Sequence, residues 1–478
     1  MPRPPESTRR RPRREVDRRR LISLAVAVVV AAVPWFVTFD DLSPEGHRLF
    51  SVFLAAVVLW VTEAIPLHAT AALIIGAQIV LISDEAILSL PEGYEAPGFA
   101  TFYAALADPI LMLFLGGFVL ADLAARYGLD RNLARVLLRP FGTRPAAVLA
   151  GVMTITAILS MFTSNTATTA AMIAVVLPLV AGLDADDPLR VGVILAVPVA
   201  ANVGGIGTPV GTPPNAIALG QLNSVGDGVT FLEWMALAVP LALVVLAVAW
   251  FALLRFHPPR AETIELTIEG RFDRSRPALI LYATFAATIA LWLTEPLHGV
   301  PSTIVGFLPV VVLMATGLFG VDDLKAINWH VLWLVAGGLA LGTGVAATGF
   351  DTWLIGLVEW GDLPTLALLA GLAAFALTLS TLISNSATAN LLIPIGLSLA
   401  VSGTIDAAPL LIGVVIAVAC SLAMALPVST PPNAIAYSTG MVSTRHLATT
   451  GIVVGLVGGV LLVVVMPLLW DAVGLVPS

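Results

Sequence analysis

The chain alternates between long apolar stretches and short polar segments along almost its whole length. An apolar stretch of roughly 17 to 25 residues is long enough to cross a bilayer as an α-helix. About eleven stretches predict single crossings, and two longer ones, 145–183 and 364–401, predict re-entrant helical hairpins that return to the side on which they begin. The single crossings are predicted at 21–37, 49–65, 67–82, 106–125, 191–222, 231–254, 278–293, 300–319, 331–347, 410–437 and 452–469.

The composition excludes a water-soluble protein. Hydrophobic residues make up 58% of the chain, charged residues only 11%, and the mean hydropathy is +0.97, whereas a soluble domain carries about a quarter charged residues. We therefore expect an all-α polytopic membrane protein. The single cysteine, Cys420, excludes an internal disulfide and a cysteine-based metal site. The sequence has no phosphate-binding Gly-Lys-Ser/Thr pattern, which argues against an ATP-driven pump.

Basic residues are concentrated at the N-terminus. Nine of the 23 Lys and Arg residues are arginines within residues 1–20, which we predict to be a disordered tail. Basic residues that flank a first span stay in the cytoplasm, so residues 21–47 hold a first transmembrane helix that starts inside. We prefer this topogenic role of the charge over nucleic-acid binding, and we expect no nucleic-acid partner.

Following the chain from a cytoplasmic N-terminus gives a consistent topology. Arg131, Arg135, Arg255 and Lys325 fall in the cytoplasm, whereas the acidic segments 40–45 and 84–95 fall outside. Only Arg48 breaks this pattern. The C-terminus is then outside, and the predicted location is the plasma (inner) membrane.

Two parts of the chain repeat one another. Residues 209–218 read Pro-Val-Gly-Thr-Pro-Pro-Asn-Ala-Ile-Ala, and residues 427–436 match them at nine of ten positions. Three further pairs of segments match in the same order: a Ser and Asn cluster at 160–168 and 380–388, a Gly-Gly segment at 116–130 and 337–351, and a Trp-x-Thr-Glu segment at 60–68 and 292–298. Four matches in series would not arise by chance.

The two copies have opposite orientations in the predicted topology, because an odd number of crossings separates equivalent positions. We assign residues 48–256 to repeat 1, 257–276 to a cytoplasmic linker and 277–478 to repeat 2, with one hairpin in each repeat. Inverted repeats are the architecture of many secondary transporters, whose substrate sites lie near the bilayer midplane where the repeats meet. The sequence therefore predicts a transporter.

Paired prolines interrupt two of the predicted crossings, at 212–215 and 430–433, which both read Thr-Pro-Pro-Asn. Proline lacks the N–H and clashes with the preceding turn, so each crossing is expected to break into two half-helices. A break leaves free carbonyls at the end of one half and free N–H groups at the start of the next. Non-helical backbone survives in a bilayer only when it is buried in protein or lines a cavity, so the breaks predict a binding site.

Polar residues gather at the expected tip of each hairpin, in the segments 164–166 and 384–386. An Asn amide both donates and accepts hydrogen bonds, as does a hydroxyl. Because these segments contain no Arg or Lys, a bound anion would be held by hydroxyls, amides and half-helix N-termini. The same motifs offer carbonyl and hydroxyl oxygens to small hard cations. Because the site has no basic side chains, a multiply charged anion bound there favours cations bound beside it.

The doubled motif set resembles the divalent anion/sodium symporter family, whose members carry dicarboxylates, citrate or sulfate. The similarity runs from about Arg48 to the C-terminus, and its further landmarks are 60–66, Asp108-Pro109-Ile110 and Gly116-Gly117. It implies a homodimer in which a scaffold domain forms the interface and a transport domain moves as an elevator. It also implies Na⁺ as the coupling ion and no other cofactor.

The resemblance assigns roles to residues by their motif positions. For the substrate it implies Ser164, Asn165, Thr166 and Thr212 from repeat 1, and Ser384, Asn385, Ser386, Thr430 and Pro431 from repeat 2. For sodium it implies a first site at Ser160, Ser164, Asn165 and Gly211, and a second at Ser380, Ile383, Asn385 and Ser429. Ser386 stands where many members have Thr, a change that keeps the hydroxyl but bears on substrate preference.

These observations predict a sodium-driven importer of C4-dicarboxylates such as succinate, malate or fumarate. Two alternatives stay open within the same fold: a sodium-independent dicarboxylate exchanger, and a carrier of citrate or sulfate. A sodium/proton antiporter is disfavoured because the predicted site has no acidic residue to carry the proton. An enzyme is disfavoured because the histidines have no nucleophile or metal partner in the motifs.

Four other repeated residues are expected to be structural. Glu63 and Glu295 lie at the ends of predicted spans, where they can bond neighbouring helices. Gly116 and Gly337 lie within predicted spans, where glycines allow helices to approach closely.

Overall fold

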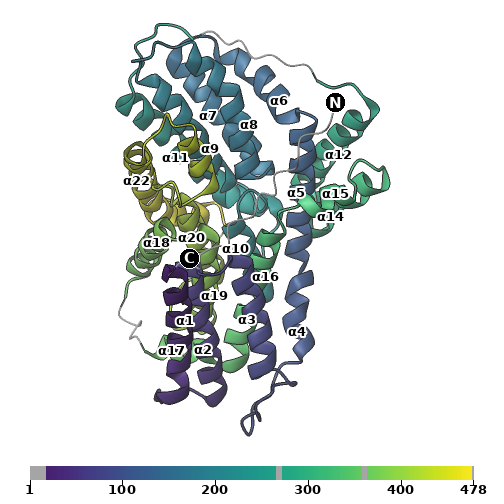
Figure 1. Ribbon diagram of the computed structural model, residues 1–478, viewed down its shortest axis with the longest axis vertical. Coiled ribbons are helices and arrows are strands. Elements are labelled where there is room, and N and C mark those ends of the chain that lie inside the picture. Colours follow the sequence, from purple (N-terminus) through teal and green to yellow (C-terminus); the bar gives the residue numbers. More distant parts are fainter. Residues whose placement is uncertain (1–17, 265–271, 358–362, 476–478) are drawn as a thin grey trace, which may run out of the picture.

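A computed structural model describes residues 18–264, 272–357 and 363–475. Every regular element in these residues is helical, and several of the helices run along the long axis of the molecule (Figure 1). Residues 1–17 of the predicted tail and 265–271 of the predicted linker lie outside the described residues. The prediction of an all-α fold is confirmed.

Among the described residues, nine helices are long and apolar enough to cross a membrane. Seven of them belong to predicted single crossings, and the other two, α7 (Pro145–Phe162) and α18 (Thr365–Leu382), are the first arms of the predicted hairpins. The chain is thus a multi-span membrane protein, as predicted. The remaining four predicted crossings contain shorter apolar helices: α3 (Leu67–Ile82), α9 (Leu189–Gly205), α14 (Ser302–Ala315) and α20 (Pro409–Leu422).

The other elements follow in chain order through the two predicted repeats. The first part contains α1 (Arg18–Phe36), α2 (Pro44–Thr62), α4 (Phe99–Ala104), the 3-10 helix η1 (Ala105–Ala107), α5 (Pro109–Arg126), α6 (Leu129–Leu138), η2 (Arg139–Phe141), α8 (Asn165–Ala181), α10 (Pro213–Ser224) and α11 (Phe231–Phe256). The second contains α12 (Arg276–Leu293), α13 (Glu295–His298), α15 (Val321–Ala326), α16 (Trp329–Thr348), α17 (Phe350–Gly356), α19 (Asn385–Val401), α21 (Pro431–Ser438), α22 (Thr444–Val460), the π-helix η3 (Leu461–Val465) and α23 (Met466–Ala472).

The crossing predicted at 106–125 contains α5, and it also contains a short break that the sequence analysis did not predict. The structure has a break at Asp108, between η1 and α5. Pro109 fills the first turn of α5, where its missing N–H has no partner to lose, and the Asp108 side chain accepts a hydrogen bond from the Ile110 N–H at 2.8 Å. A hydropathy pattern does not reveal this cap, because the residues on both sides of it are apolar.

Two short helices beside the hairpins, α6 and α17, were not predicted as separate elements. Each follows a glycine in the left-handed conformation, Gly128 with φ +62° and Gly349 with φ +63°. These glycines are equivalent in the two predicted repeats, so the repeated Gly positions correspond to repeated turns.

The two predicted repeats exchange contacts symmetrically. Helix α3 packs on α16, and its equivalent α14 packs on α5. Helix α10 packs on α19 and α20, and its equivalent α21 packs on α8 and α9. In Figure 1 the first hairpin lies toward the upper end and α19 toward the lower end, with α10 between them. The second half of each broken crossing is therefore embedded in the other repeat.

Glycines allow the helices of the two repeats to approach closely. A Cβ atom added to Gly116 on α5 would lie 1.6 Å from the carbonyl oxygen of Gly306 on α14. A Cβ atom added to Gly337 on α16 would lie 2.4 Å from Cβ of Ala71 on α3. The predicted close-packing role of both positions is confirmed.

Glu295 joins the starts of two helices. Its carboxylate accepts hydrogen bonds from the N–H groups of Phe231 at 3.1 Å and Ser302 at 3.2 Å, and only 8% of the residue is exposed. The predicted inter-helix bonding is confirmed for Glu295. Glu63 differs, since it lies exposed at the end of α2 with φ 47°.

Candidate functional site

Both hairpins turn within two residues, at 163–164 and 383–384. The second residue of each turn is a serine in an extended conformation that forms the N-cap, and the next helix begins at Asn165 or Asn385. The free N–H groups and the positive dipole ends of α8 and α19 therefore lie at the two hairpin tips.

The two proline-rich crossings break in the same way. Helices α9 and α10 are separated by residues 206–212, and α20 and α21 by residues 423–430. Thr212 and Thr430 are the N-caps of the second halves, and the prolines fill the first positions of these helices. The prediction of a break at each Pro-Pro pair is confirmed.

Asn215 and Asn433, which end the two Thr-Pro-Pro-Asn motifs, satisfy the carbonyls that the breaks leave free. The Asn215 Nδ2 donates to three carbonyls of the segment before it, at 2.8–3.1 Å, and the Asn433 Nδ2 donates to two, at 2.7 and 3.0 Å. Both asparagines are 0% exposed. Their amides thus hold the half-helices together. The acceptors are Gly205, Ile206 and Thr208 in repeat 1, and Met424 and Leu426 in repeat 2.

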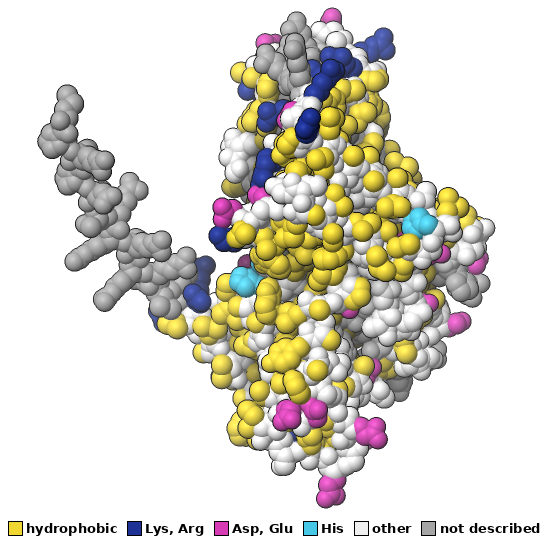
Figure 2. Space-filling model, turned by 90° about the vertical axis from the view of Figure 1, so that its right-hand side faces the viewer, with side chains coloured by type: hydrophobic (Ala, Val, Ile, Leu, Met, Phe, Trp, Pro, Cys, Tyr) yellow, Lys and Arg dark blue, Asp and Glu magenta, His cyan; other side chains and the backbone are white. Residues whose placement is uncertain are grey.

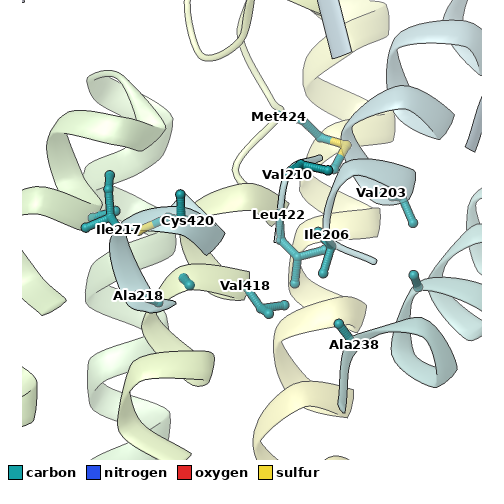
Figure 3. Packing of buried hydrophobic residues seen from close by; sticks show 14 of the residues in the cluster. Val203, Ile206, Val210, Ile217, Ala218, Ala238, Val418, Cys420, Leu422 and Met424 are labelled. Carbon is teal, nitrogen blue, oxygen red and sulfur yellow. The ribbon is translucent and has the colours of Figure 1, made fainter. Parts of the chain in front are cut away.

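Apolar side chains from both breaks pack in one buried cluster. Figure 3 shows Val203 at the end of α9 and Ile206 and Val210 of the first break in one cluster with Leu422 at the end of α20 and Met424 of the second break. All five side chains are buried. This packing fixes the two breaks against each other and shields their polar backbone on this side.

A cavity of about 390 Å³ lies where the hairpin tips meet the breaks. Because the N-cap residues of α8, α10, α19 and α21 line it, four helix N-termini converge there and favour an anion. Every residue predicted for the substrate is part of its wall: Ser164, Asn165, Thr166, Thr212, Ser384, Asn385, Ser386, Thr430 and Pro431.

Some of the residues predicted for sodium line this cavity, and the others are buried behind its lining. Ser160 and Ser380 are 0% exposed behind the tips, and they donate to the carbonyls of Ala201 at 2.8 Å and Cys420 at 3.0 Å. Ile383 is buried in the turn of the second hairpin. The others line the cavity itself: Ser164, Asn165, Gly211, Asn385 and Ser429.

The side-chain amide of Asn165 lies among oxygen atoms. One of its terminal atoms is adjacent to the Ser160 hydroxyl and lies 3.2 and 3.0 Å from the carbonyl oxygens of Ala201 and Gly211. With nitrogen at this position the amide donates to both carbonyls. In that orientation the amide joins the first hairpin tip to α9 and to the break that follows it.

Asn202 on α9 connects the two repeats across the cavity wall, and it was not predicted. Its Nδ2 donates to Oγ1 of Thr430 at 3.1 Å and to Oδ1 of Asn433 at 3.3 Å. The direction of these bonds is fixed, because Asn433 uses its own Nδ2 on carbonyls. Since Oγ1 of Thr430 also accepts from the Asn433 N–H at 3.3 Å, its hydroxyl proton remains free to donate into the cavity.

In the described part of the chain, the motif of repeat 1 receives no equivalent pair of hydrogen bonds from repeat 2. Ser421 occupies the position equivalent to Asn202, and its hydroxyl donates at 3.0 Å to Ala417 of its own helix. Accordingly, Oδ1 of Asn215 is buried without a hydrogen-bond partner within the described residues. Thr212 makes no side-chain cap bond, unlike Thr430. The two Thr-Pro-Pro-Asn motifs are therefore held differently, although both line the same cavity.

Two more polar residues of the wall, Asn328 and His330 at the start of α16, were not predicted. Of the described residues that line the cavity, His330 alone has an ionisable side chain, and it is close enough to His68 for an electrostatic interaction. The equivalent positions in repeat 1 are Ala107 and Pro109, so comparing the repeats could not find these residues.

Two solved transporter structures share this fold. The YdaH transporter of Alcanivorax borkumensis matches with a TM-score of 0.56 and 16% identity, over 86% of this chain and 99% of that one. The antimetabolite efflux pump MtrF of Neisseria gonorrhoeae matches with a TM-score of 0.51 and 12% identity, over 92% and 97%. At these identities the likeness concerns the fold alone.

Sequence relatives identify the family. The sodium-dependent dicarboxylate transporter SdcS of Staphylococcus saprophyticus is 30% identical over 466 residues, which cover 89% of this chain and 86% of that protein. The SdcS protein of Staphylococcus aureus is 29% identical with the same coverage. The family model described as the sodium:sulfate symporter transmembrane region matches residues 17–476. The chain therefore belongs to the sodium:sulfate symporter family of membrane transporters and is not an enzyme, in agreement with its resemblance to the divalent anion/sodium symporters.

Proposed function

We propose that this protein imports C4-dicarboxylates, such as succinate, malate or fumarate, together with sodium. The observation that carries the proposal is the cavity between the two hairpin tips and the two breaks, where hydroxyls, amides and four helix N-termini converge. No Arg or Lys of the described residues lines it. Neutral donors bind carboxylates without neutralising them, so a dianion in this cavity favours cations bound beside it.

The shape of the site favours a short dicarboxylate. Its volume of about 390 Å³ is near the lower end of the roughly 300–1,000 Å³ that ligand pockets occupy. Each repeat contributes its own set of donors, which suits a ligand with one carboxylate at each end. The names of the relatives, sodium-dependent dicarboxylate transporters, favour this class over sulfate, which has a single anionic centre.

Two sodium sites are part of the proposal, and each combines oxygens of one hairpin tip with oxygens of the adjacent break. Ion binding would then order each tip against its break and complete the substrate site. The Ser160 hydroxyl and the Gly211 carbonyl lie around the Asn165 amide, and both offer oxygen atoms of the kind that the first site requires. The first site would use Ser160, Ser164, Asn165 and Gly211, and the second Ser380, Ile383, Asn385 and Ser429.

Transport would follow an elevator mechanism in a homodimer of the plasma (inner) membrane. The loaded transport domain slides past the scaffold, and coupling rests on a differential affinity that is typically about 1–3 kcal/mol. The N-terminus would be cytoplasmic and the C-terminus outside. The surface supports this orientation, because most Lys and Arg side chains in Figure 2 lie in the upper half, a group of Asp and Glu lies at the lower end, and hydrophobic surface separates them.

Uptake of radiolabelled succinate into proteoliposomes tests the proposal. An inward sodium gradient should drive accumulation, and an equal gradient of potassium should not. Excess unlabelled malate and fumarate should compete more strongly than citrate or sulfate. Counterflow without sodium would instead identify an exchanger, preferential competition by citrate or sulfate would reassign the substrate, and no flux of any of these anions would refute the proposal.

A further inference from the structure

A basic pocket lies where the end of α11 meets the start of α22, two helices that pack together at the left of Figure 1. Its volume is about 770 Å³, and its wall includes Arg255, His257, Arg445 and His446. None of these residues lines the substrate cavity. No acidic side chain of the described residues lines the pocket, so its chemistry suits an anion.

His257 points to a ligand in this pocket. The residue is 7% exposed, and its Nε2 is buried without a hydrogen-bond partner among the described residues. Its ring stands edge-on to that of His446, with the centroids 5.5 Å apart. Burial, together with the neighbouring His446, lowers the pKa of His257 to about 4, so the ring is neutral and can offer one N–H. Buried polar atoms without partners are uncommon, and an anion would satisfy this one.

The acidic residues at this end of α11 are engaged by a different arginine. Asp186 forms an ion pair with Arg260, and Asp187 accepts hydrogen bonds from the N–H groups of Arg260 at 3.2 Å and Ala261 at 2.9 Å. The ion pairs found among the described residues do not include Arg255 or Arg445. Within the described part of the chain, the two guanidinium groups are thus available to a ligand.

An apolar groove continues from the basic pocket along α22. It has a volume of about 230 Å³, lies between α18 and α22, and includes Gly455 and Gly459. Residues of the pocket and of the groove recur every three or four positions, so they form one continuous stripe on a single face of α22. This stripe consists of Arg445, Thr449, Ile452, Leu456 and Gly459.

The start of the groove lies about one leaflet's depth below the basic pocket. At 1.5 Å per residue, the groove begins roughly 15 Å below Arg445, about half the thickness of the hydrocarbon core. The surroundings are also lipid-like, because Phe251 is 67% exposed, Ile452 51% and Leu456 59%. A ligand that fills both parts must therefore carry an anionic head and an apolar chain.

We propose that the pocket and the groove bind one anionic phospholipid, with its phosphate between Arg255 and Arg445 and an acyl chain against Gly455 and Gly459. Guanidinium groups bind phosphate through paired charge-assisted hydrogen bonds, and basic pockets between transmembrane helices are typical sites for acidic headgroups. The lipid would bridge α11, α18 and α22, and it would stabilise the contact between these helices.

The test compares phosphatidylglycerol with phosphatidylcholine on the delipidated full-length protein. Native mass spectrometry should detect one retained phosphatidylglycerol per protomer, and the thermal midpoint should rise with phosphatidylglycerol only. The double variant Arg255→Gln/Arg445→Gln should bind this lipid at least about tenfold more weakly, since bonds to charged groups are lost. Arg276→Gln, an exposed arginine outside the pocket, is the matched control and should bind normally.

The groove is tested separately from the charge. A Cβ atom at Gly459 would meet only Cδ1 of Leu377, at 3.8 Å, so Gly459→Leu fills the groove without a backbone clash. This variant should also lose phosphatidylglycerol, whereas Gly371→Leu, at an open position of α18, should retain it. Equal binding of the two lipids would overturn the proposal, as would retention of lipid by Gly459→Leu. An equal thermal shift with inorganic phosphate alone would identify a soluble anion as the ligand instead of a lipid.

Discussion

The Thr430 hydroxyl is held as a donor by two groups, the Asn202 amide and the N–H of Asn433. Replacing Asn202 with alanine removes the first group and leaves Oδ1 of Asn433 without its partner. Loss of a buried hydrogen bond costs about 1–2 kcal/mol, so we expect Asn202→Ala to raise the KM for succinate about tenfold. The maximal rate should change less. Uptake measured over a range of succinate concentrations separates the two parameters.

Ser421→Ala is the matched control for this prediction. Ser421 occupies the equivalent position in repeat 2, but among the described residues its hydroxyl bonds only Ala417 of its own helix. We expect the KM of this variant to be unchanged. A wild-type KM in Asn202→Ala would contradict the role of Asn202 in orienting Thr430.

Asn165 and Asn385 each belong to the proposed substrate site and to a proposed sodium site. We therefore expect Asn165→Ala and Asn385→Ala each to lower the initial rate of uptake by more than about a hundredfold, equivalent to roughly 3 kcal/mol. Thr284→Ala on α12 is a suitable control, because the single bond of this hydroxyl within the described residues is to the Ile280 carbonyl. Size-exclusion profiles should match the wild type. A wild-type rate in either Asn variant would remove that residue from the site.

Repetition explains which site residues the sequence reveals. The motif residues at both tips and both breaks occur twice, and all nine predicted for the substrate line one cavity. Asn202, Asn328 and His330 occur once, so comparing the repeats could not single them out. Asn215 and Asn433 were visible in the motifs, but their bonds to free carbonyls depend on the folded loops.

At the scale of the helices, the contact between α5 and α14 depends on Gly116. Its Cβ would overlap the Gly306 carbonyl, so the two helices would have to separate. Overpacking typically costs about 1–3 kcal/mol, and we expect Gly116→Ala to lower the thermal midpoint by several degrees or to prevent folding. Gly76→Ala on α3 has nothing within 4 Å of the new Cβ and should be neutral or slightly stabilising. Equal midpoints in the two variants would contradict the close contact.

Helix α6 contains a buried carboxyl group, Asp130, which is 4% exposed. Burial raises the pKa of Asp130 to about 6, above the roughly 3.9 of an unfolded chain. The folded state therefore disfavours the ionised form, and stability is lost as pH rises between these two values. We expect Asp130→Asn to raise the thermal midpoint at about pH 8 and to have little effect near pH 4. Thermal scans at both pH values measure the difference, and a midpoint gain that is the same at both would contradict it.

The helical elements were predictable where a strong local signal coincided with hydropathy. The Pro-Pro pairs marked the breaks at 206–212 and 423–430, because two prolines in an apolar run cannot continue a helix. The break at Asp108 carries a single proline at a helix start, which is also compatible with an unbroken apolar stretch. Helices α6 and α17 are short and partly polar, so a search for membrane spans passes over them.

For the whole molecule, the predicted topology places Arg131 and Lys325 on one side of the membrane and Glu92 on the other. The single native cysteine, Cys420, is 0% exposed, so single-cysteine variants can be labelled over a low background. We expect a membrane-impermeant maleimide to label Glu92→Cys in intact cells. Arg131→Cys and Lys325→Cys should react only after the cells are opened, because basic segments stay inside. Labelling of Arg131 and Lys325 from different sides would refute the inverted topology.

The exchange of half-helices between the repeats also constrains how the protein is made. When the ribosome has completed α10, the helices that will cover it, α19 and α20, have not yet been synthesised. Until α19 and α20 are inserted, α10 and the break before it therefore lack the protein that buries them, and the insertion machinery or lipid must shield them. Neither half is a self-sufficient folding unit, and a nascent chain that stops early leaves polar loop backbone for membrane proteases to recognise.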